Sequence, residues 1–395
     1  MRYLSTRGEA AATDFTTAML DGLAPDGGLY VPEEIPSLPE EWASWSYVEA
    51  ISNVLGLFGA ADTEELVKEA ATRFAHPDIA PIVAVGDRSV LEMFWGPTLS
   101  FKDHALQVVA RLLSREADSG VVLGATSGDT GSAAIEALRG LPNLKVVILF
   151  PDGRVSDFQR RQMTTVPERN VHAVAVRGTF DDCQQLVKKA MASHPQLLAI
   201  NSINWARIAV QTGYHVHAAA RMAEPFDVVV PTGNFGNVYS CWLAKKMGVP
   251  IETITIANNA NHTLSDLVNT GHQGTMTVVP TMAPAMDIQV PSNLERFRGD
   301  LASEFRASWC DDGQIRSTIA AVEETHGYRL DPHTATAWHA ADEMESDRAQ
   351  VVVATAHPSK FDDSVPTPHW FADLPSRERF VTIDATTSEL EHLIR

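Results

Sequence analysis

The sequence predicts an α/β protein with doubly wound parallel sheets. Two observations support this fold class: apolar runs of strand length alternate with helix-like segments from Ile82 to Ala354, and several runs lead directly into turns of small residues. Such alternation is typical of strand–helix–strand units. Because ligands of doubly wound sheets bind at the carboxyl ends of the strands, we expect functional residues in those turns.

The first 80 residues predict a mostly helical N-terminal extension. Apolar spacing indicates a short helix over 15–23, ended by a glycine-containing turn at 24–28, and prolines then make an extended connector. Further helices are expected over 48–58 and 63–74, the second beginning at Thr63 before two glutamates.

The remainder, 81–395, carries the alternation. Strands are expected at 121–123, 145–150, 172–176, 226–230, 251–257 and 350–354, with helices between them at 106–113, 133–138, 208–222 and 238–247. Residues 262–345 resemble an insertion rich in loops and helices.

Length and composition indicate a soluble protein of two or three domains, at about 150 residues per domain. The chain has 395 residues, of which 45% are hydrophobic and 21% charged. Its net charge of −19 argues against nucleic acid and anionic membrane as partners. A local cluster of donors can still bind an anionic substrate.

Cysteine usage and the N-terminus indicate a cytoplasmic protein. Cys183, Cys241 and Cys310 include no Cys-x-x-Cys pair, which predicts neither disulfides nor a zinc site. No signal-peptide core and no apolar run of about 18 residues occurs. His215 and His217 lie two apart on an expected helix, so we interpret them as structural, and no metal is expected.

The stretch from Trp95 to Gln107 places a lysine where a turn meets a helix. Gly96-Pro97 marks the turn, and helical apolar spacing includes Leu106. Lys102 lies at the helix start, where a side chain can face a cleft. It could be a solvated surface charge, hold a phosphate, or form a Schiff base with an aldehyde cofactor.

Residues 232–237 form a glycine turn between an expected strand and helix. Glycines let backbone amides approach a phosphate, and a helix N-terminus favours an anion. The alternative is an ordinary strand–helix turn. No Gly-Lys-Ser/Thr follows, which excludes a nucleoside-triphosphate loop of that type.

Two further turns carry polar groups. Residues 126–130 offer hydroxyls and amides suited to a carboxylate, although Ser127, Asp129 or Thr130 could simply cap a helix. Residues 201–207 offer amides, a hydroxyl and Arg207, which can bind phosphate bidentately. The alternative there is a polar loop with an exposed arginine.

Several motifs occur together in one order. They read Gly-Pro-Thr-Leu-Ser-Phe-Lys-Asp at 96–103, Ala-Thr-Ser-Gly-Asp-Thr-Gly-Ser at 125–132, Pro-Thr-Gly-Asn-Phe-Gly-Asn at 231–237, Pro-Ala-Met-Asp-Ile-Gln-Val at 284–290 and Ala-Thr-Ala-His-Pro-Ser-Lys-Phe at 354–361. The opening adds Tyr3, residues 5–8 and Asp-Gly-Gly-Leu-Tyr-Val-Pro at 26–32. Through these motifs and their order, the chain resembles the threonine synthase family of pyridoxal-phosphate (PLP) enzymes along nearly its whole length.

The resemblance implies a fold like that of tryptophan synthase β: two doubly wound domains with PLP in the cleft between them. The smaller domain is expected at about 100–225, with the rest of the catalytic region forming the larger. Residues 1–80 would be the family's N-terminal extension.

The resemblance also implies residue roles. Lys102 would bind PLP covalently and act as the base, with Asp129 near the ring oxygen and Thr355 at the pyridine nitrogen. Further cofactor contacts would come from Phe101, Gly233, Asn234, Phe235, Gly236 and Asn237. The substrate would be bound by Thr126, Ser127, Gly128, Thr130, Asn201, Ser202, Asn204 and Arg207.

The implied reaction converts O-phospho-L-homoserine and water into L-threonine and phosphate, in a monomer or homodimer. Two alternatives remain: a phospho-lyase or ammonia-lyase that releases 2-oxobutyrate, and a non-catalytic metabolite-binding relative. The chain departs from the family at Trp95 and at 258–262, and the sequence leaves Arg154, His357 and Lys360 without a place.

Overall fold

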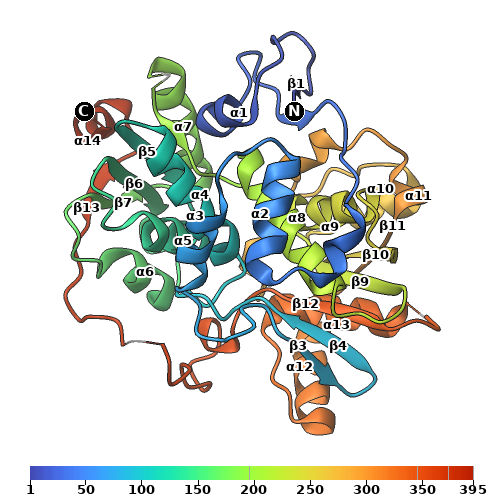
Figure 1. Cartoon of the computed structure of the whole chain (residues 1–395). Coiled ribbons are helices and arrows are strands. Elements are labelled where there is room, and N and C mark those ends of the chain that lie inside the picture. The colour runs from blue at the N-terminus through green and yellow to red at the C-terminus, as the bar shows by residue number, and fades with distance from the viewer. Residues whose placement is uncertain (195, 345, 372, 395) are drawn as a thin grey trace.

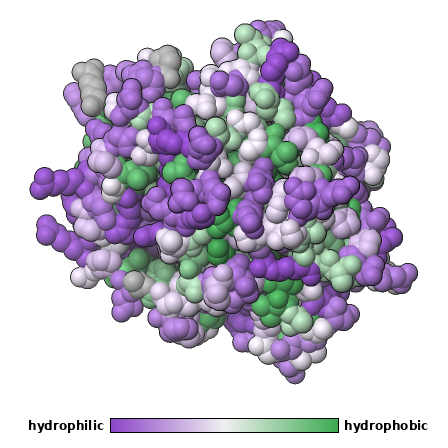
Figure 2. All heavy atoms as spheres, viewed as in Figure 1, coloured by the Kyte–Doolittle hydropathy of each residue, from purple (hydrophilic) through white to green (hydrophobic). Residues whose placement is uncertain are grey.

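Two sheets organise the protein, and they occupy opposite sides of the view in Figure 1. The structure is a computed structural model that describes residues 1–194, 196–344, 346–371 and 373–394. Hydrophilic residues cover most of the face seen in Figure 2, and apolar residues gather in small patches. Within the described residues, no helix is long and apolar enough to cross a membrane.

The five-stranded sheet is entirely parallel. Its order is β13 (Val381–Asp384), β7 (Val171–Arg177), β6 (Leu144–Pro151), β5 (Gly120–Ala125) and β8 (Leu198–Ala199). Successive residues of β6 face opposite sides of the sheet. Val146 belongs to the hydrophobic core that includes α4 (Lys102–Glu116) and α5 (Asp129–Leu138). Val147 belongs to the core that includes α7 (Phe180–Ser193) and α14 (Thr387–Ile394). Helices on both faces confirm the doubly wound prediction.

The six-stranded sheet is parallel except for an edge hairpin. Its order is β11 (Phe305–Trp309), β10 (Ile251–Asn258), β9 (Phe226–Pro231), β12 (Gln350–Ala354), β4 (Arg88–Glu92) and β3 (Ile82–Val85), with β3 antiparallel to β4. One face contacts the core that includes α8 (Trp205–Ala219) and α9 (Gly236–Lys246). The other packs with α12 (Asp312–His326) and α13 (Pro332–Glu343).

The N-terminal helices form where the sequence predicts them. They are α1 (Phe15–Asp21), α2 (Tyr47–Leu57) and α3 (Glu64–Ala71), beside a small β1 (Tyr3–Ser5) and β2 (Tyr30–Pro32) sheet and a 3₁₀ turn, η1 (Glu40–Ser44). Ser46 and Glu49 cap α2 reciprocally, which satisfies amides that the first turn leaves free. Tyr47 Oη also forms a hydrogen bond with His104 Nδ1 at 2.8 Å, so the extension packs directly on α4.

Two strands near the C-terminal half add to the expected chain organisation. Residues 262–345, expected to be rich in loops and helices, also contain β11, which extends the larger sheet, and α13 packs against that sheet. They also contain α10 (Thr263–Thr270), α11 (Leu301–Glu304), η2 (Pro284–Met286) and η3 (Ser292–Arg296). Strand β13, near the end of the chain, pairs with β7 and so returns the chain to the five-stranded sheet.

Candidate active site

Lys102, the first residue of α4, lies in a buried ion cluster. Its Nζ is 3.2 Å from Oδ2 of Asp129, and Lys360 Nζ is 2.8 Å from the other carboxylate oxygen. The side chains of Lys102, Asp129 and Lys360 are 11%, 4% and 0% exposed. This burial excludes the solvated-surface alternative for Lys102.

The cluster favours a neutral Lys102 and an ionised Asp129. Burial lowers the pKa of Lys102; the charge of Asp129 opposes that change, whereas Lys360 and Arg207 reinforce it. Burial raises the pKa of Asp129, but the charges of Lys360 and Lys102 outweigh it and hold that pKa well below its ordinary value. A lysine with a lowered pKa can act as a nucleophile and a base.

The turn before α5 leaves Asp129 available to the cluster. Gly128 is the N-cap residue, with a φ of +145°, and no side chain caps the helix there. Thr126 closes the turn, because its Oγ1 accepts hydrogen bonds from the backbone amides of Gly128 and Gly131 at 2.9 and 2.8 Å. Ser127 is exposed and Thr130 half-buried, and neither amide donates to an acceptor within the described residues. The capping alternative is therefore wrong for Asp129.

The glycine turn at the start of α9 presents a run of free amides. From Gly233 to Asn237, no backbone N–H donates to an acceptor in the part of the chain that the structure describes. Phe235 adopts a left-handed φ of +64°, and a Cβ on Gly233 would lie 2.6 Å from the carbonyl oxygen of Ala285. Successive amides of this kind form an anion-binding concavity.

Buried side chains of α8 support this turn from behind. Tyr214 Oη and His215 Nε2 both donate to Oδ1 of Asn237 at 2.8 Å, and Nδ2 of Asn237 is buried without a partner among the described residues. Burial lowers the pKa of His215 to about 4, so it is neutral at neutral pH. His217 packs on Tyr47 instead, in agreement with the structural interpretation of both histidines.

The polar loop at 201–207 lies against the glycine turn, since Nδ2 of Asn234 donates to Oγ of Ser202 at 3.0 Å. Arg207 is 2% exposed, and its guanidinium donates to the carbonyl of Ile200 at 3.2 Å. Its Nε is buried and has no partner among the described residues. Burial lowers the pKa of Arg207 to about 10, which leaves it cationic at neutral pH with donors to spare. Asn201 Oδ1 is engaged within the loop.

The predicted substrate-binding role of Asn204 is not supported. Its Oδ1 accepts from the amide of Ala206 at 3.0 Å and so caps α8. Its Nδ2 donates to the carbonyls of Met19 and Ala199 at 2.7 and 3.0 Å. With both polar atoms committed and no exposure, Asn204 positions the loop and has no free group for a ligand.

Asn293 and Arg296, which the sequence interpretation did not single out, hold the two loops together. Asn293 Nδ2 donates to the carbonyls of Ser202 and Asn234 at 3.2 and 3.1 Å. Arg296 donates to the carbonyls of Tyr30 and Ile203. Their only sequence signal was a polar cluster after a proline, at 292–296, which is typical of any surface turn.

The end of β12 completes the site. The carbonyl of Thr355 accepts from the amide of Phe101 at 2.8 Å, which places Thr355 beside the start of α4, and its hydroxyl has no hydrogen bond within the described residues. Lys102 Nζ lies 5.1 Å from the centre of the Phe101 ring. Lys360 ends η4 (Pro358–Lys360), and His357 caps that turn through Ser359. Arg154 is exposed.

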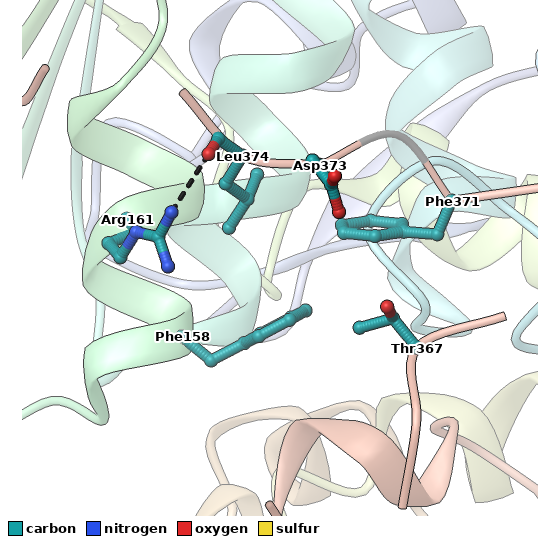
Figure 3. A pocket seen from close by; sticks show the side chains of 6 residues that line it. All are labelled: Phe158, Arg161, Thr367, Phe371, Asp373 and Leu374. Carbon is teal, nitrogen blue, oxygen red and sulfur yellow. Dashed lines mark hydrogen bonds between the residues drawn. The ribbon is translucent and has the colours of Figure 1, made fainter. Parts of the chain in front are cut away.

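Helix α6 (Asp157–Thr164) joins the ion cluster to the returning C-terminal segment. On one side Gln159 Nε2 donates to Asp129 Oδ1 at 2.9 Å. On the other, Phe158 stacks on Phe371, and Arg161 donates to the carbonyl of Leu374 at 2.8 Å, around a hollow of about 380 Å³ (Figure 3).

The two departures from the family pattern have structural partners. Trp95 stacks on Trp370 of the C-terminal segment, with 5.4 Å between the ring centroids. Asn258 Nδ2 donates to the carbonyl of Thr232 at 2.7 Å, and Asn259 and Asn261 both donate to Asp287. The polar stretch therefore braces the glycine turn.

Comparison with known proteins identifies the class. The family model described as "Pyridoxal-phosphate dependent enzyme" matches residues 91–356, and the model "Threonine synthase N terminus" matches residues 2–71. The fold and site thus define a PLP-dependent enzyme, with PLP as its cofactor.

The relatives are more specific. A curated threonine synthase from Pseudomonas aeruginosa is 40% identical over 97% of this chain and 95% of its own length. The solved structure of PLP-bound threonine synthase from Brucella melitensis has a TM-score of 0.93 and 39% sequence identity, and the match covers all of both chains. The solved structure of threonine synthase from Escherichia coli has a TM-score of 0.89 and 31% sequence identity, and the match covers 100% of this chain and 99% of that one. The chain belongs to the threonine synthase family, a family of PLP-dependent lyases.

Proposed function

We propose that this site converts O-phospho-L-homoserine and water into L-threonine and inorganic phosphate. The observation that carries the proposal is the charge of the site: the cations Lys360 and Arg207 are buried beside Lys102, and the carboxylate that acts on Lys102 is Asp129. A buried surplus of positive charge is costly unless anions compensate it. A phosphorylated cofactor and a phosphorylated amino acid supply such anions.

The residues present fit PLP. The free amides from Gly233 to Asn237, with the unpaired Nδ2 of Asn237, match the acceptor oxygens of a phosphate. Lys102 offers a buried amine for the cofactor's aldehyde, and Thr355 offers a neutral hydroxyl for the pyridine nitrogen. When bound, PLP stores the electrons released as substrate C–H bonds break.

The substrate would be held at its two anionic ends. The free amides of Ser127 and Thr130, at the start of α5, suit the α-carboxylate. Arg207, with Ser202 and Asn201, suits the phosphate. Fixing both ends aligns the leaving group with the carbon from which a proton is removed, an orientation effect.

Lys102 is the group that moves protons in this proposal. Its lowered pKa makes a neutral amine available, and Asp129 is unsuited to compete because its Oδ1 already accepts from Lys360 and Gln159. Lys102 Nζ would remove the α-proton and return protons as phosphate leaves and water adds.

A product assay tests the proposal. The protein loaded with PLP would receive O-phospho-L-homoserine, and phosphate, threonine and 2-oxobutyrate would be quantified together. Equal amounts of phosphate and threonine, abolished in Lys102→Ala, are expected. Phosphate with 2-oxobutyrate would instead identify a phospho-lyase, and no phosphate despite bound PLP would refute the assignment of Arg207.

We further propose an N-terminal extension at 1–80 and a catalytic region at 81–395, whose smaller unit spans about 100–225 together with the returning strand β13. Free, buried Cys183, Cys241 and Cys310 favour a reducing, cytoplasmic setting. We expect a monomer or homodimer, and sedimentation velocity would distinguish them.

A further inference from the structure

Lys360 is a second buried lysine whose chemistry the reaction above does not use. Its Nζ donates to the carbonyl of Thr98 at 2.7 Å and lies 2.8 Å from Asp129 Oδ1, and its side chain has no exposure. Burying an ammonium group is expensive, so a lysine in such a place needs strong compensation. The Asp129 carboxylate supplies it.

The two partners of this ion pair come from different sheets. Lys360 follows β12 of the six-stranded sheet, and Asp129 begins α5, after β5 of the five-stranded sheet. Lys102 lies on the other oxygen of the same carboxylate, at 3.2 Å. Asp129 is therefore shared by two lysines, of which one belongs to the proposed chemistry.

We propose that Lys360 is a positioning residue that engages the Asp129 carboxylate and thereby allows the Lys102 amine to be neutral when it acts. This inference rests on the proposed role of Lys102. If Asp129 faced Lys102 alone, the two would form a simple buried ion pair, and the lysine would retain its proton. Lys360 offsets part of that attraction with a charge that takes no part in the reaction.

The signs of the electrostatic effects agree with this role. The charged groups that act on Lys102 are Asp129 from α5, Lys360 from η4 and Arg207 from α8. Asp129 raises the pKa of Lys102, whereas burial, Lys360 and Arg207 lower it. On Asp129 itself, Lys360, Lys102 and His333 of α13 all favour the ionised form.

A merely structural Lys360 would predict something different. It would affect melting temperature and the alignment of the two sheets, but it would leave the protonation of Lys102 unchanged in any variant that folds. The protonation of the Lys102 nitrogen, rather than activity, is therefore the decisive quantity.

The experiment compares Lys360→Met, Lys360→Arg and the exposed control Lys188→Met in the full-length, PLP-loaded protein. The visible absorption band is titrated with pH, because it reports protonation of the nitrogen that joins Lys102 to the cofactor. In parallel, the rate of Lys102 acetylation in the cofactor-free full chain is measured by mass spectrometry across the same pH range.

In Lys360→Met, the midpoint of both titrations should rise by at least about one pH unit, which is about a tenfold loss of neutral amine at a given pH. The midpoints of Lys360→Arg and Lys188→Met should stay within about 0.3 pH units of the parent's. The double variant Asp129→Asn, Lys360→Met should have a midpoint closer to that of the parent than Lys360→Met alone. Midpoints unchanged in folded Lys360→Met would overturn the inference.

The proposed function can fail separately. A protein that makes no threonine but shows the shift retains the inference, and one that makes threonine without the shift loses only the inference. If Lys360→Met does not fold, the double variant decides, since a double variant with a raised midpoint contradicts the role of Asp129.

Discussion

Replacing Gly233 by alanine should weaken PLP binding without unfolding the protein. The new Cβ would lie 2.6 Å from the backbone oxygen of Ala285, whereas real Cβ contacts are essentially never closer than 3.0 Å. The segments that contain Gly233 and Ala285 must therefore separate by at least about 0.4 Å. Ala285 cannot easily yield, because its amide donates to His333 and the following Asp287 accepts from Asn259. The glycine turn would move instead.

The expected loss follows from the hydrogen bonds that this movement misaligns. Backbone N–H groups that bind a charged acceptor each contribute about 1.5–3 kcal/mol. Weakening two amides near Gly233 should therefore cost about 3 kcal/mol, or about 100-fold in the dissociation constant for PLP. The assay is titration of cofactor-free protein with PLP, followed by visible absorption.

Gly56→Ala is the matched control, because a Cβ there meets nothing within 4 Å and Gly56 lies inside α2. It should leave PLP affinity unchanged and stabilise the fold by about 0.5–1 kcal/mol. If Gly233→Ala bound PLP within about threefold of the parent, a phosphate grip by this turn would be untenable.

Three further substitutions test other parts of the site. Arg207→Gln should reduce kcat/KM for the phosphorylated substrate about 10- to 100-fold through loss of a charge-assisted contact, with PLP affinity and melting temperature maintained; a drop in PLP affinity of equal size would contradict this. Asn204→Ala should destabilise the fold by about 2–3 kcal/mol in urea denaturation, through the lost cap and two buried hydrogen bonds, whereas a substrate role would raise KM without changing stability. Burial raises the pKa of Asp103 to about 7, so the folded state retains this proton above the ordinary value of 3.8, and stability should fall as pH rises from about 4 to 7. Relative to Asp103→Asn, the parent should lose up to about 4 kcal/mol over that interval, and parallel stability curves would exclude the raised pKa.

The strands, the helices and the local motifs followed closely from the sequence. The apolar runs 146–150 and 228–230 are buried on both faces, and that pattern needs no knowledge of distant partners. The glycine turn and Lys102 were also identifiable, because a turn between strand and helix restricts where its side chains can lie. These features depend on neighbours in sequence.

Contacts between distant segments could not be predicted in the same way. Lys360 and Asp129 are 231 positions apart, and nothing in either motif indicates that the two meet. The structural partners of Asn204 could not be predicted either, because an amide in a polar loop can serve a ligand or a helix cap equally well, and the carbonyls of Met19 and Ala199 that it contacts are distant in sequence or outside the motif. The four-residue strand β13 is too short and too exposed to show an apolar pattern.

The position of β13 bears on how this protein is synthesised. Until the ribosome has produced residue 384, the outer edge of β7 has no neighbour, although every other strand of that sheet was translated more than 180 residues earlier. An unpaired strand edge invites association with other chains. A nascent chain, or one cut short before residue 381, would therefore expose the edge of β7 to pairing with other chains.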